Sequence, residues 1–246
     1  MSDSVKIVKI CGLKTPTEAQ KAIDSGANLL GAILVPNRAR TIEISSAIEI
    51  SQICKKKRKE LKREYQDSKE LMKYLNSRID LKESDWFQHV AETVCANGPF
   101  FVGVFRNQSI EDVLKLSDLI DLDIVQLHGS ENFEEYIDKI SLPVIPRYVL
   151  QNENIKDAIM TNRHLIPLLD SELGGEGKLI NWGDAVKFSQ DLNGRYILAG
   201  GLTPENVSQA LLTEGCLGVD VSGGVETDGV KDLTKIENFV LNAKSI

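Results

Sequence analysis

Apolar residues along this chain gather into short runs that alternate with longer amphipathic segments. The runs are almost wholly apolar, which is typical of strands buried on both faces of a parallel sheet. We predict eight strands, over residues 5–10, 29–35, 100–105, 123–129, 142–149, 165–169, 195–199 and 217–221.

Each predicted strand is followed by a segment whose apolar residues have helical spacing. The segment after the first strand begins with Thr15 as a candidate N-cap and Pro16 at the first helical position, and Gly26 marks its end. Thr203 and Pro204 predict the same start for the helix after the seventh strand. We predict helices over residues 15–25, 43–53, 109–119, 132–139, 152–161, 182–191, 203–212 and 232–243.

A strand and a helix that alternate eight times over 246 residues predict an α/β fold, a (β/α)8 TIM barrel that forms a single domain over residues 1–246. The alternative is an open, doubly wound sheet. Its dinucleotide-binding form loses support because no G-x-G-x-x-G sequence follows the first strand.

The segment at residues 54–98, after the second strand, has a different character. Residues 55–64 include seven basic and two acidic side chains, and the charged sequence that follows favours helix and lacks a strand pattern. Too few apolar residues occur here for a separate core. We therefore expect a solvated helical insertion that is not an independent domain. The alternative is that the basic run binds nucleic acid or a membrane.

Composition narrows the class of protein. The net charge of −7 argues against broad nucleic-acid binding, which needs a basic face, but not against a small anionic substrate. No apolar run is long enough to span a membrane, and the chain enters its first strand without a signal segment, so we expect a cytoplasmic protein. The cysteines, at positions 11, 54, 95 and 216, form no C-x-x-C pair and have no histidine at metal spacing, which predicts neither disulfides nor a metal site.

Polar residues stand where the predicted strands end. In a parallel barrel these ends face one mouth, where the chemistry of such barrels is found. Asp170 is the clearest case, because it closes an apolar strand and precedes the glycine-rich loop of residues 171–178. Each residue alone has a structural explanation, such as a turn cap for Asp170 or a surface ion pair for Arg40. Together they predict one site that contains Cys11, Arg40, Gln126, His128, Asp170, Gly200, Gly201, Asp220 and Ser222.

Glycine-rich turns follow the last two strands. Gly200 and Gly201 precede one predicted helix, and Ser222, Gly223 and Gly224 follow strand eight. Glycines let a backbone approach a ligand closely, and the loops after strands seven and eight of such barrels frequently bind phosphate. We predict a phosphorylated substrate, although two ordinary tight turns would have the same sequence.

Five motifs in order resemble those of phosphoribosylanthranilate isomerase, a family of tryptophan biosynthesis. The motifs are Lys9-Ile10-Cys11-Gly12-Leu13, Val125-Gln126-Leu127-His128-Gly129, residues 168–178, residues 198–207 and residues 218–226. Residues 35–42 and 102–108 are most similar to the single-function fungal enzymes. Two features depart from the family pattern: the segment near residues 51–98 is longer, and Gly223 follows Ser222 where many relatives have a second serine.

The resemblance implies a barrel that carries out an Amadori rearrangement of N-(5-phosphoribosyl)anthranilate, a phosphorylated aminosugar, without cofactor or metal. It implies Asp170 as general acid and Cys11 as general base. It also implies that Arg40 faces the anthranilate carboxylate and Asp220 holds the substrate near the reacting carbons. Gln126 and His128 would line the mouth, and the phosphate would bind at Gly200, Gly201, Ser222 and Gly223. We expect a monomer without nucleic-acid or membrane partners.

Three alternatives stay open at this point. A ribulose-phosphate epimerase would need metal ligands that three histidines do not supply. An indole-glycerol-phosphate synthase would need a catalytic lysine at a strand end, and Lys9 alternates with apolar positions. From a different class, the chain could be a catalytically silent phosphate-binding barrel that scaffolds a complex through its basic insertion.

Overall fold

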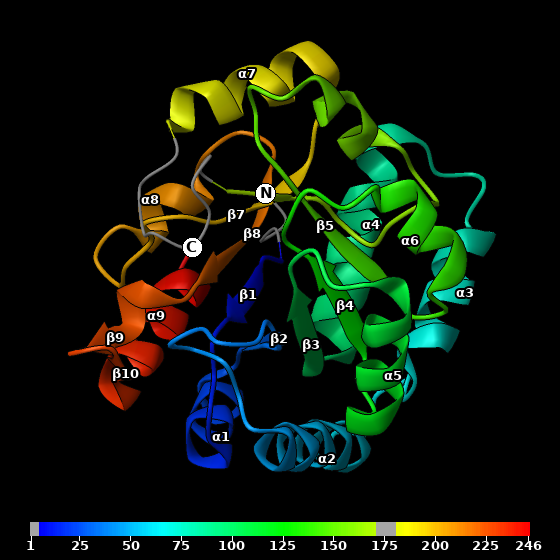
Figure 1. The fold of residues 1–246 in the computed structure, drawn as a ribbon. Coiled ribbons are helices and arrows are strands. Elements are labelled where there is room, and N and C mark those ends of the chain that lie inside the picture. Colours follow the sequence, from blue (N-terminus) through cyan, green and yellow to red (C-terminus); the bar gives the residue numbers. More distant parts are fainter. Residues whose placement is uncertain (1–4, 171–180) are drawn as a thin grey trace.

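Eight parallel strands hydrogen-bond in chain order and close into a barrel in the computed structural model, which describes residues 5–170 and 181–246. Strand β1 pairs with β2 on one side and with β8 on the other, which closes the barrel and confirms the predicted fold (Figure 1). The barrel strands are β1 (Ile7–Ile10), β2 (Leu29–Ile33), β3 (Phe100–Phe105), β4 (Ile124–Leu127), β5 (Val144–Tyr148), β6 (Leu168–Leu169), β7 (Tyr196–Leu198) and β8 (Cys216–Val221).

Helices surround the barrel on its outside, as Figure 1 shows. They are α1 (Pro16–Ser25), α2 (Ile44–Glu60), α3 (Ser68–Ser77), α4 (Glu83–Asn97), α5 (Ile110–Ile120), α6 (Phe133–Lys139), α7 (Trp182–Leu192), α8 (Val207–Leu211) and α9 (Leu233–Lys244), with 3₁₀ helices η1 (Glu153–Ile159) and η2 (Gly223–Val225). A short hairpin of β9 (Glu226–Thr227) and β10 (Val230–Lys231) follows η2. Within the described ranges, no helix combines the length and the apolar character needed to cross a membrane.

The predicted start of α1 is confirmed in detail. The side chain of Thr15 accepts a hydrogen bond from the backbone N–H of Glu18, and the Glu18 carboxylate accepts one from the N–H of Thr15. Gly26 ends the helix in the left-handed region, with φ of 102°. Both signals are local, so the sequence alone could specify them.

Two predicted helices differ from the structure. The segment at residues 152–161 is a 3₁₀ helix rather than an α-helix. Helix α8 begins at Val207, with Asn206 at its N-cap, and the predicted cap Thr203 lies in the preceding loop. The Asn206 side chain accepts a hydrogen bond from the N–H of Thr203 at 2.8 Å and donates one to the carbonyl of Gly201 at 3.1 Å. Asn206 therefore shapes the loop that precedes the helix.

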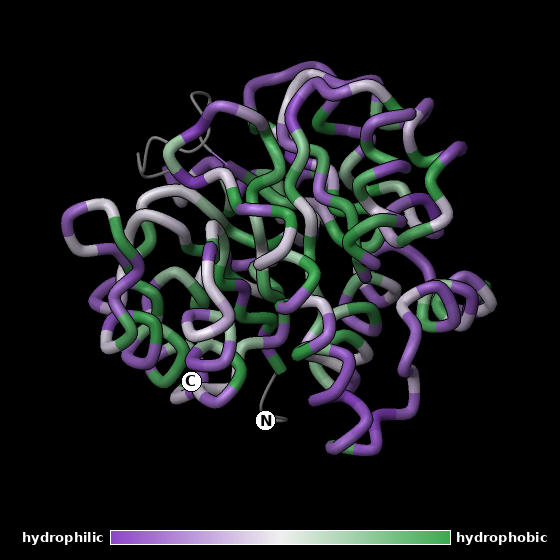
Figure 2. Tube along the Cα trace, turned by 60° about the horizontal axis from the view of Figure 1, so that its bottom comes forward, coloured by the Kyte–Doolittle hydropathy of each residue, from purple (hydrophilic) through white to green (hydrophobic). Residues whose placement is uncertain are grey.

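Side chains alternate between the two faces of each strand. On β1, Val8 and Ile10 belong to the core between the strands and the surrounding helices, whereas Ile7 belongs to a second apolar cluster inside the barrel. The same alternation places Lys9 and then Cys11 inside the barrel, progressively nearer its carboxyl end. Figure 2 shows the more hydrophobic stretches toward the interior of the molecule and the hydrophilic ones on its outer turns.

The insertion between β2 and β3 is helical, as predicted, but the expectation that it is wholly solvated is wrong for α4. Trp86, Phe87 and Val90 are at most 1% exposed, and they share one apolar cluster with residues that begin the barrel strands, such as Ile7 and Phe100. Helix α4 therefore covers the amino end of the barrel. The charged composition of the insertion concealed this apolar face.

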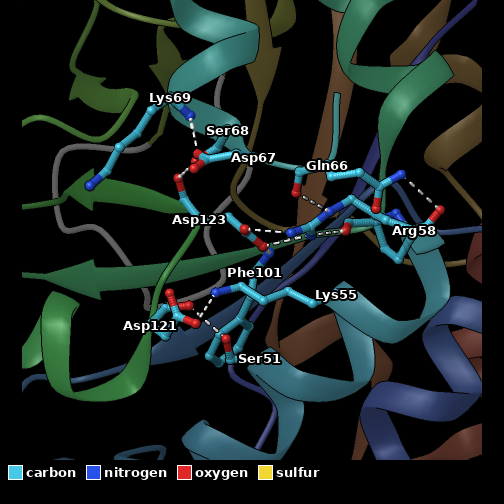
Figure 3. Close-up of polar contacts among 11 residues, drawn as sticks. Ser51, Lys55, Arg58, Gln66, Asp67, Ser68, Lys69, Phe101, Asp121 and Asp123 are labelled. Carbon is cyan, nitrogen blue, oxygen red and sulfur yellow. Dashed lines mark hydrogen bonds and ion pairs between the residues drawn. The ribbon is translucent and has the colours of Figure 1, made fainter. Parts of the chain in front are cut away.

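The basic run is only partly a basic surface: Lys56, Lys59 and Lys62 are exposed, but Arg58 is not. Arg58 is fully buried, and its guanidinium donates two hydrogen bonds to the carboxylate of Asp123, at 2.7 and 2.8 Å (Figure 3). It also donates to the carbonyls of Pro99 and Gln66. Ser68, at the start of α3, donates to the carbonyl of Asp123 at 2.6 Å. These contacts attach α2 and α3 to Asp123, the residue that precedes the amino end of β4.

Candidate active site

A cavity of about 760 Å³ opens at the carboxyl ends of the strands. All ten residues that the sequence analysis placed in the site line this cavity: Cys11, Arg40, Gln126, His128, Asp170, Gly200, Gly201, Asp220, Ser222 and Gly223. The glycine-rich segment of residues 171–178, which we predicted as a loop above the site, lies outside the described residues.

Cys11 follows β1 and reaches the cavity with 5% of its surface exposed. Burial raises the pKa of its thiol, because a thiolate loses solvation there. The nearby ammonium of Lys9 opposes this rise, and the carboxylate of Asp220 adds to it. The protonation of Cys11 is therefore set by neighbours inside the barrel.

Lys9 lies two residues before Cys11, on the same face of β1, and is fully buried. Its Nζ donates a hydrogen bond to Oδ1 of Asp220 on β8 at 2.9 Å. Gly31 of β2 makes room for this group, since a Cβ there would lie 2.8 Å from Sγ of Cys11 and 3.0 Å from Nζ of Lys9. Alanine at position 31 would push the lysine and the cysteine apart.

Asp170 enters the cavity from β6, with 6% of its surface exposed. Its Oδ2 lies 3.4 Å from Nε2 of His128 and 3.8 Å from Nε of Arg147. The other ring nitrogen of His128, Nδ1, lies 3.1 Å from Nε2 of Gln126. Burial lowers the pKa of Arg147, and the charge of Asp170 opposes that shift. Gln126, His128 and Asp170 line the same cavity as Cys11, whereas Arg147 of β5 contacts Asp170 without lining it.

Arg40 lies in the loop after β2 and forms an ion pair with Glu226 of the hairpin. Its Nε and Nη2 donate to the two carboxylate oxygens of Glu226, at 2.7 and 2.9 Å. Lys231 also donates to Glu226, at 2.7 Å. Burial alone would raise the pKa of Glu226, but the hydrogen bonds from Arg40 and Lys231 lower it to about 2. Glu226 is thus a carboxylate that holds Arg40 at the rim.

The loops after β7 and β8 meet on one side of the cavity. Gly200 and Gly201 have φ of 87° and 66°, which places both in the left-handed region that favours glycine. Gly224 packs on the β7 loop so closely that a Cβ would lie 1.8 Å from the carbonyl oxygen of Leu202. A Cβ on Gly223 would lie 3.2 Å from Nη2 of Arg40. The two loops therefore present backbone, rather than bulky side chains, to a ligand.

Four residues near the site were missed by the sequence analysis or given no role: Lys9, Arg147, Glu226 and Lys231. The period-two alternation of the strands was a usable signal for Lys9 and Arg147, because it puts each on the same face as an inward residue. Glu226 lies inside a motif that we quoted but did not interpret. No local signal marks Lys231, since its role depends on how the hairpin folds back over the barrel mouth.

Comparison with known proteins gives a consistent family. A family model described as N-(5'phosphoribosyl)anthranilate (PRA) isomerase matches residues 52–242. The chain is 48% identical to an N-(5'-phosphoribosyl)anthranilate isomerase of Wickerhamomyces anomalus, and the match covers 96% of this chain and 99% of that one. It is 47% identical to the same enzyme of Komagataella pastoris, again over 96% and 99% of the two chains.

Solved structures agree with this result. Phosphoribosyl anthranilate isomerase from Thermotoga maritima superposes with a TM-score of 0.69 at 29% identity, over 98% of this chain and 100% of that one. A crystal structure of such an isomerase in complex with reduced 1-(o-carboxyphenylamino)-1-deoxyribulose 5-phosphate has a TM-score of 0.67 at 27% identity, over the same shares of the two chains.

Proposed function

The chain belongs to the N-(5'-phosphoribosyl)anthranilate isomerase family of tryptophan biosynthesis, and we propose how its own residues perform the isomerisation. The reaction is an Amadori rearrangement, in which N-(5-phosphoribosyl)anthranilate becomes 1-(2-carboxyphenylamino)-1-deoxyribulose 5-phosphate. One observation supports the assignment of residues above all. A thiol from β1 and a carboxyl from β6 line one cavity, beside the glycine loops that follow β7 and β8.

Asp170 is the general acid and Cys11 the general base in this proposal. Asp170 gives a proton to the furanose ring oxygen, and the ring opens to a Schiff base at C1. The Cys11 thiolate then removes the proton from C2, which the imine has made acidic, and an enolamine forms. The enolamine gains a proton at C1 and loses one from O2, which yields the ketone. Positioned acids and bases of this kind typically accelerate proton transfers by about 10²–10⁴-fold.

Arg40 binds the anthranilate carboxylate in this scheme. Its pairing with Glu226 uses Nε and Nη2, so the carboxylate would approach the Nη1 side of the guanidinium. A planar guanidinium fixed on one edge recognises a carboxylate with little loss of side-chain freedom. Asp220 would hold the sugar near the reacting carbons, and Gln126 and His128 would line the opposite side of the mouth.

The phosphate group of the substrate binds at the glycine loops. Gly200, Gly201, Ser222 and Gly223 all line the cavity, and loops that carry no Cβ let a phosphate come within reach of backbone N–H groups. Helix α8 is only five residues long and begins beyond the loop, so the loop amides rather than a helix end supply the donors. Gly223 replaces the second serine of many relatives, which leaves one hydroxyl fewer for the phosphate beside that of Ser222.

Substitution of Cys11 and Asp170 tests the assignment. Cys11→Ser and Asp170→Asn should each abolish turnover, followed as the loss of phosphoribosylanthranilate fluorescence, while circular dichroism shows an unchanged fold. Cys95→Ser is the matched control, because Cys95 is a thiol that does not line the cavity. Full activity in either active-site variant would remove that residue from the chemistry.

The scaffold alternative requires a chain that binds the substrate and does not convert it. Deletion of the basic insertion does not distinguish a scaffold from an enzyme, because α4 packs on the barrel core and its loss would damage both. Turnover by the intact chain, lost on Cys11→Ser, decides the question instead. The monomeric state and the cytoplasmic location stay predictions, and light scattering of the purified chain measures the first.

A further inference from the structure

A buried lysine lies beside the thiol that we assign as the base. Lys9 and Cys11 are on the same face of β1, and each interacts with the other through its polar end. Both lie over Gly31 of β2, within 3.0 Å of the point where a Cβ would stand. Asp220 of β8 completes the cluster through its 2.9 Å contact with Nζ of Lys9. A fully buried ammonium is expensive to maintain, so its position needs an explanation.

We propose that Lys9 is a positioning residue that holds the Cys11 sulfur in place and serves as the counter-ion of its thiolate. This inference rests on the proposed role of Cys11 as the base. The ammonium is anchored by Asp220, and its Nζ and the Cys11 sulfur lie 3.0 and 2.8 Å from the same point above Gly31. A thiolate that forms there has an opposite charge beside it, which it shares with Asp220.

Other charged groups around Cys11 do not serve this purpose equally well. The positive charges of Arg40 and Lys231, at the rim, also interact with the Cys11 sulfur. Both side chains donate hydrogen bonds to Glu226, whose negative charge offsets theirs. Asp220 destabilises the thiolate by its own charge. Among these cations Lys9 lowers the pKa of Cys11 most, more than Lys231 does, and it lies with the sulfur inside the barrel over Gly31 rather than at the rim.

Lys9 supports the base and does not replace it. Burial opposes its positive charge, but Asp220 and Cys11 together raise the pKa of the ammonium above its ordinary value. A lysine that keeps its proton cannot accept another. The C2 proton of the substrate therefore goes to the Cys11 thiolate, which becomes a thiol, while Lys9 stays charged throughout the step.

Alkylation of Cys11 by iodoacetamide measures the thiolate directly. The rate is followed from about pH 7 to about pH 11, where a raised midpoint also shows as a slower rate at every pH below it, and the Cys11 peptide is quantified by mass spectrometry. Lys9→Met should raise the midpoint of the pH profile by roughly 1–3 units, because an opposite charge in contact is removed. Asp220→Asn should lower it, because Lys9 then faces the sulfur alone. Cys95 is the internal control, since Lys244 rather than Lys9 is the cation that acts on it.

Lys9→Met is the deciding variant, because Asp220→Asn removes a negative charge near the sulfur and should lower the midpoint whether or not the lysine acts. An unchanged Cys11 midpoint in folded Lys9→Met overturns the inference. If Lys9→Met does not fold, Lys9→Gln takes its place, since the neutral amide can still hydrogen-bond Asp220 and should likewise raise the Cys11 midpoint; an unchanged midpoint there overturns the inference as well. Failure of the proposed function has a different signature: Cys11→Ser would still turn over substrate, whatever the alkylation profiles show.

Discussion

Replacement of Arg58 by methionine should destabilise the whole barrel, although Arg58 lies in the insertion and far from the cavity. Arg58 is fully buried and Asp123 nearly so, with side-chain exposures of 0% and 3%. The guanidinium donates two hydrogen bonds to Asp123 and further ones to two backbone carbonyls, and it lies 4.8 Å from the centroid of the Phe100 ring. Methionine fills a similar volume but donates none of these hydrogen bonds.

The expected loss is large because one charge is left behind. In the Arg58→Met variant the Asp123 carboxylate still accepts a hydrogen bond from the N–H of Phe101, at 2.8 Å. It loses the guanidinium that neutralised its charge. Removal of one partner from a buried ion pair lowers the free energy of unfolding by about 3–5 kcal/mol. For a chain of this length that corresponds to a fall in melting temperature of about 6–20 °C.

The loss should depend on pH. Burial raises the pKa of Asp123 in the folded state even while Arg58 is present, and it should rise further in Arg58→Met. A folded-state pKa above the unfolded value means that the folded chain binds the extra proton. Stability is therefore retained below the unfolded pKa and is lost as the pH rises through the folded-state value. The difference between variant and wild type should shrink between about pH 7.5 and about pH 5.

Urea unfolding followed by far-UV circular dichroism and by tryptophan fluorescence measures this effect. Trp86 reports on the insertion and Trp182 on the barrel wall, so a Trp182→Phe background isolates the insertion. The matched control is Lys56→Met on the same helix, because Lys56 is 79% exposed and its contact with Glu60 is 3.9 Å long. The control should change stability by at most about 0.5 kcal/mol.

Coincident transitions from the two probes would support the prediction that the insertion is no independent domain. An Arg58→Met variant as stable as Lys56→Met would refute the argument from buried charge. So would a variant in which Trp86 loses its native fluorescence well before the barrel unfolds, because the ion pair would then stabilise only the insertion.

Other consequences of the site geometry are testable in the same way. Glu226→Gln should raise KM about tenfold and leave kcat within about twofold, because Arg40 loses orientation and not reactivity; an unchanged KM contradicts this role. Gly224→Ala should lower kcat/KM by about 10²-fold by forcing the β7 and β8 loops apart, whereas Gly183→Ala, in the first turn of α7 and away from the cavity, should leave it unaltered. Because burial raises the pKa of Cys11, kcat/KM should rise with pH above neutrality, and a flat profile would argue against a thiolate base.

Much of the fold was predictable because its signals are local. Apolar runs marked all eight strands, and the caps of α1 were specified by residues three positions apart. The strand at residues 165–169 was shorter in the structure, since Pro167 has no N–H for the ladder, and only Leu168–Leu169 pair regularly. The site residues were predictable for the same reason: each lies in the last positions of a strand or in the loop after it, and parallel strands bring their carboxyl ends together.

The role of the insertion was not predictable from its composition. The apolar side chains of α4 are few, and their burial depends on the open amino end of a barrel that forms from strands elsewhere in the chain. The average composition of residues 54–98 is charged because it is dominated by side chains that face solvent. It does not reveal the apolar face that α4 turns toward the barrel. The periodicity of Trp86, Phe87, Val90 and Val94 was the available signal, and it is visible only when the segment is taken helix by helix.

Buried charges mark the limit of what the sequence specifies. Arg58 and Asp123 are 65 positions apart, and Lys9 and Asp220 are 211 apart. A sequence shows that a lysine or arginine is present, and the strand period shows which face of the sheet a residue such as Lys9 occupies. The carboxylate that pairs with it is determined only when the barrel closes. Both cations looked like ordinary polar residues, one in a basic run and one in an alternating strand. In the folded chain one joins the insertion to the barrel, and the other lies beside the sulfur of Cys11, the residue that we propose as the base.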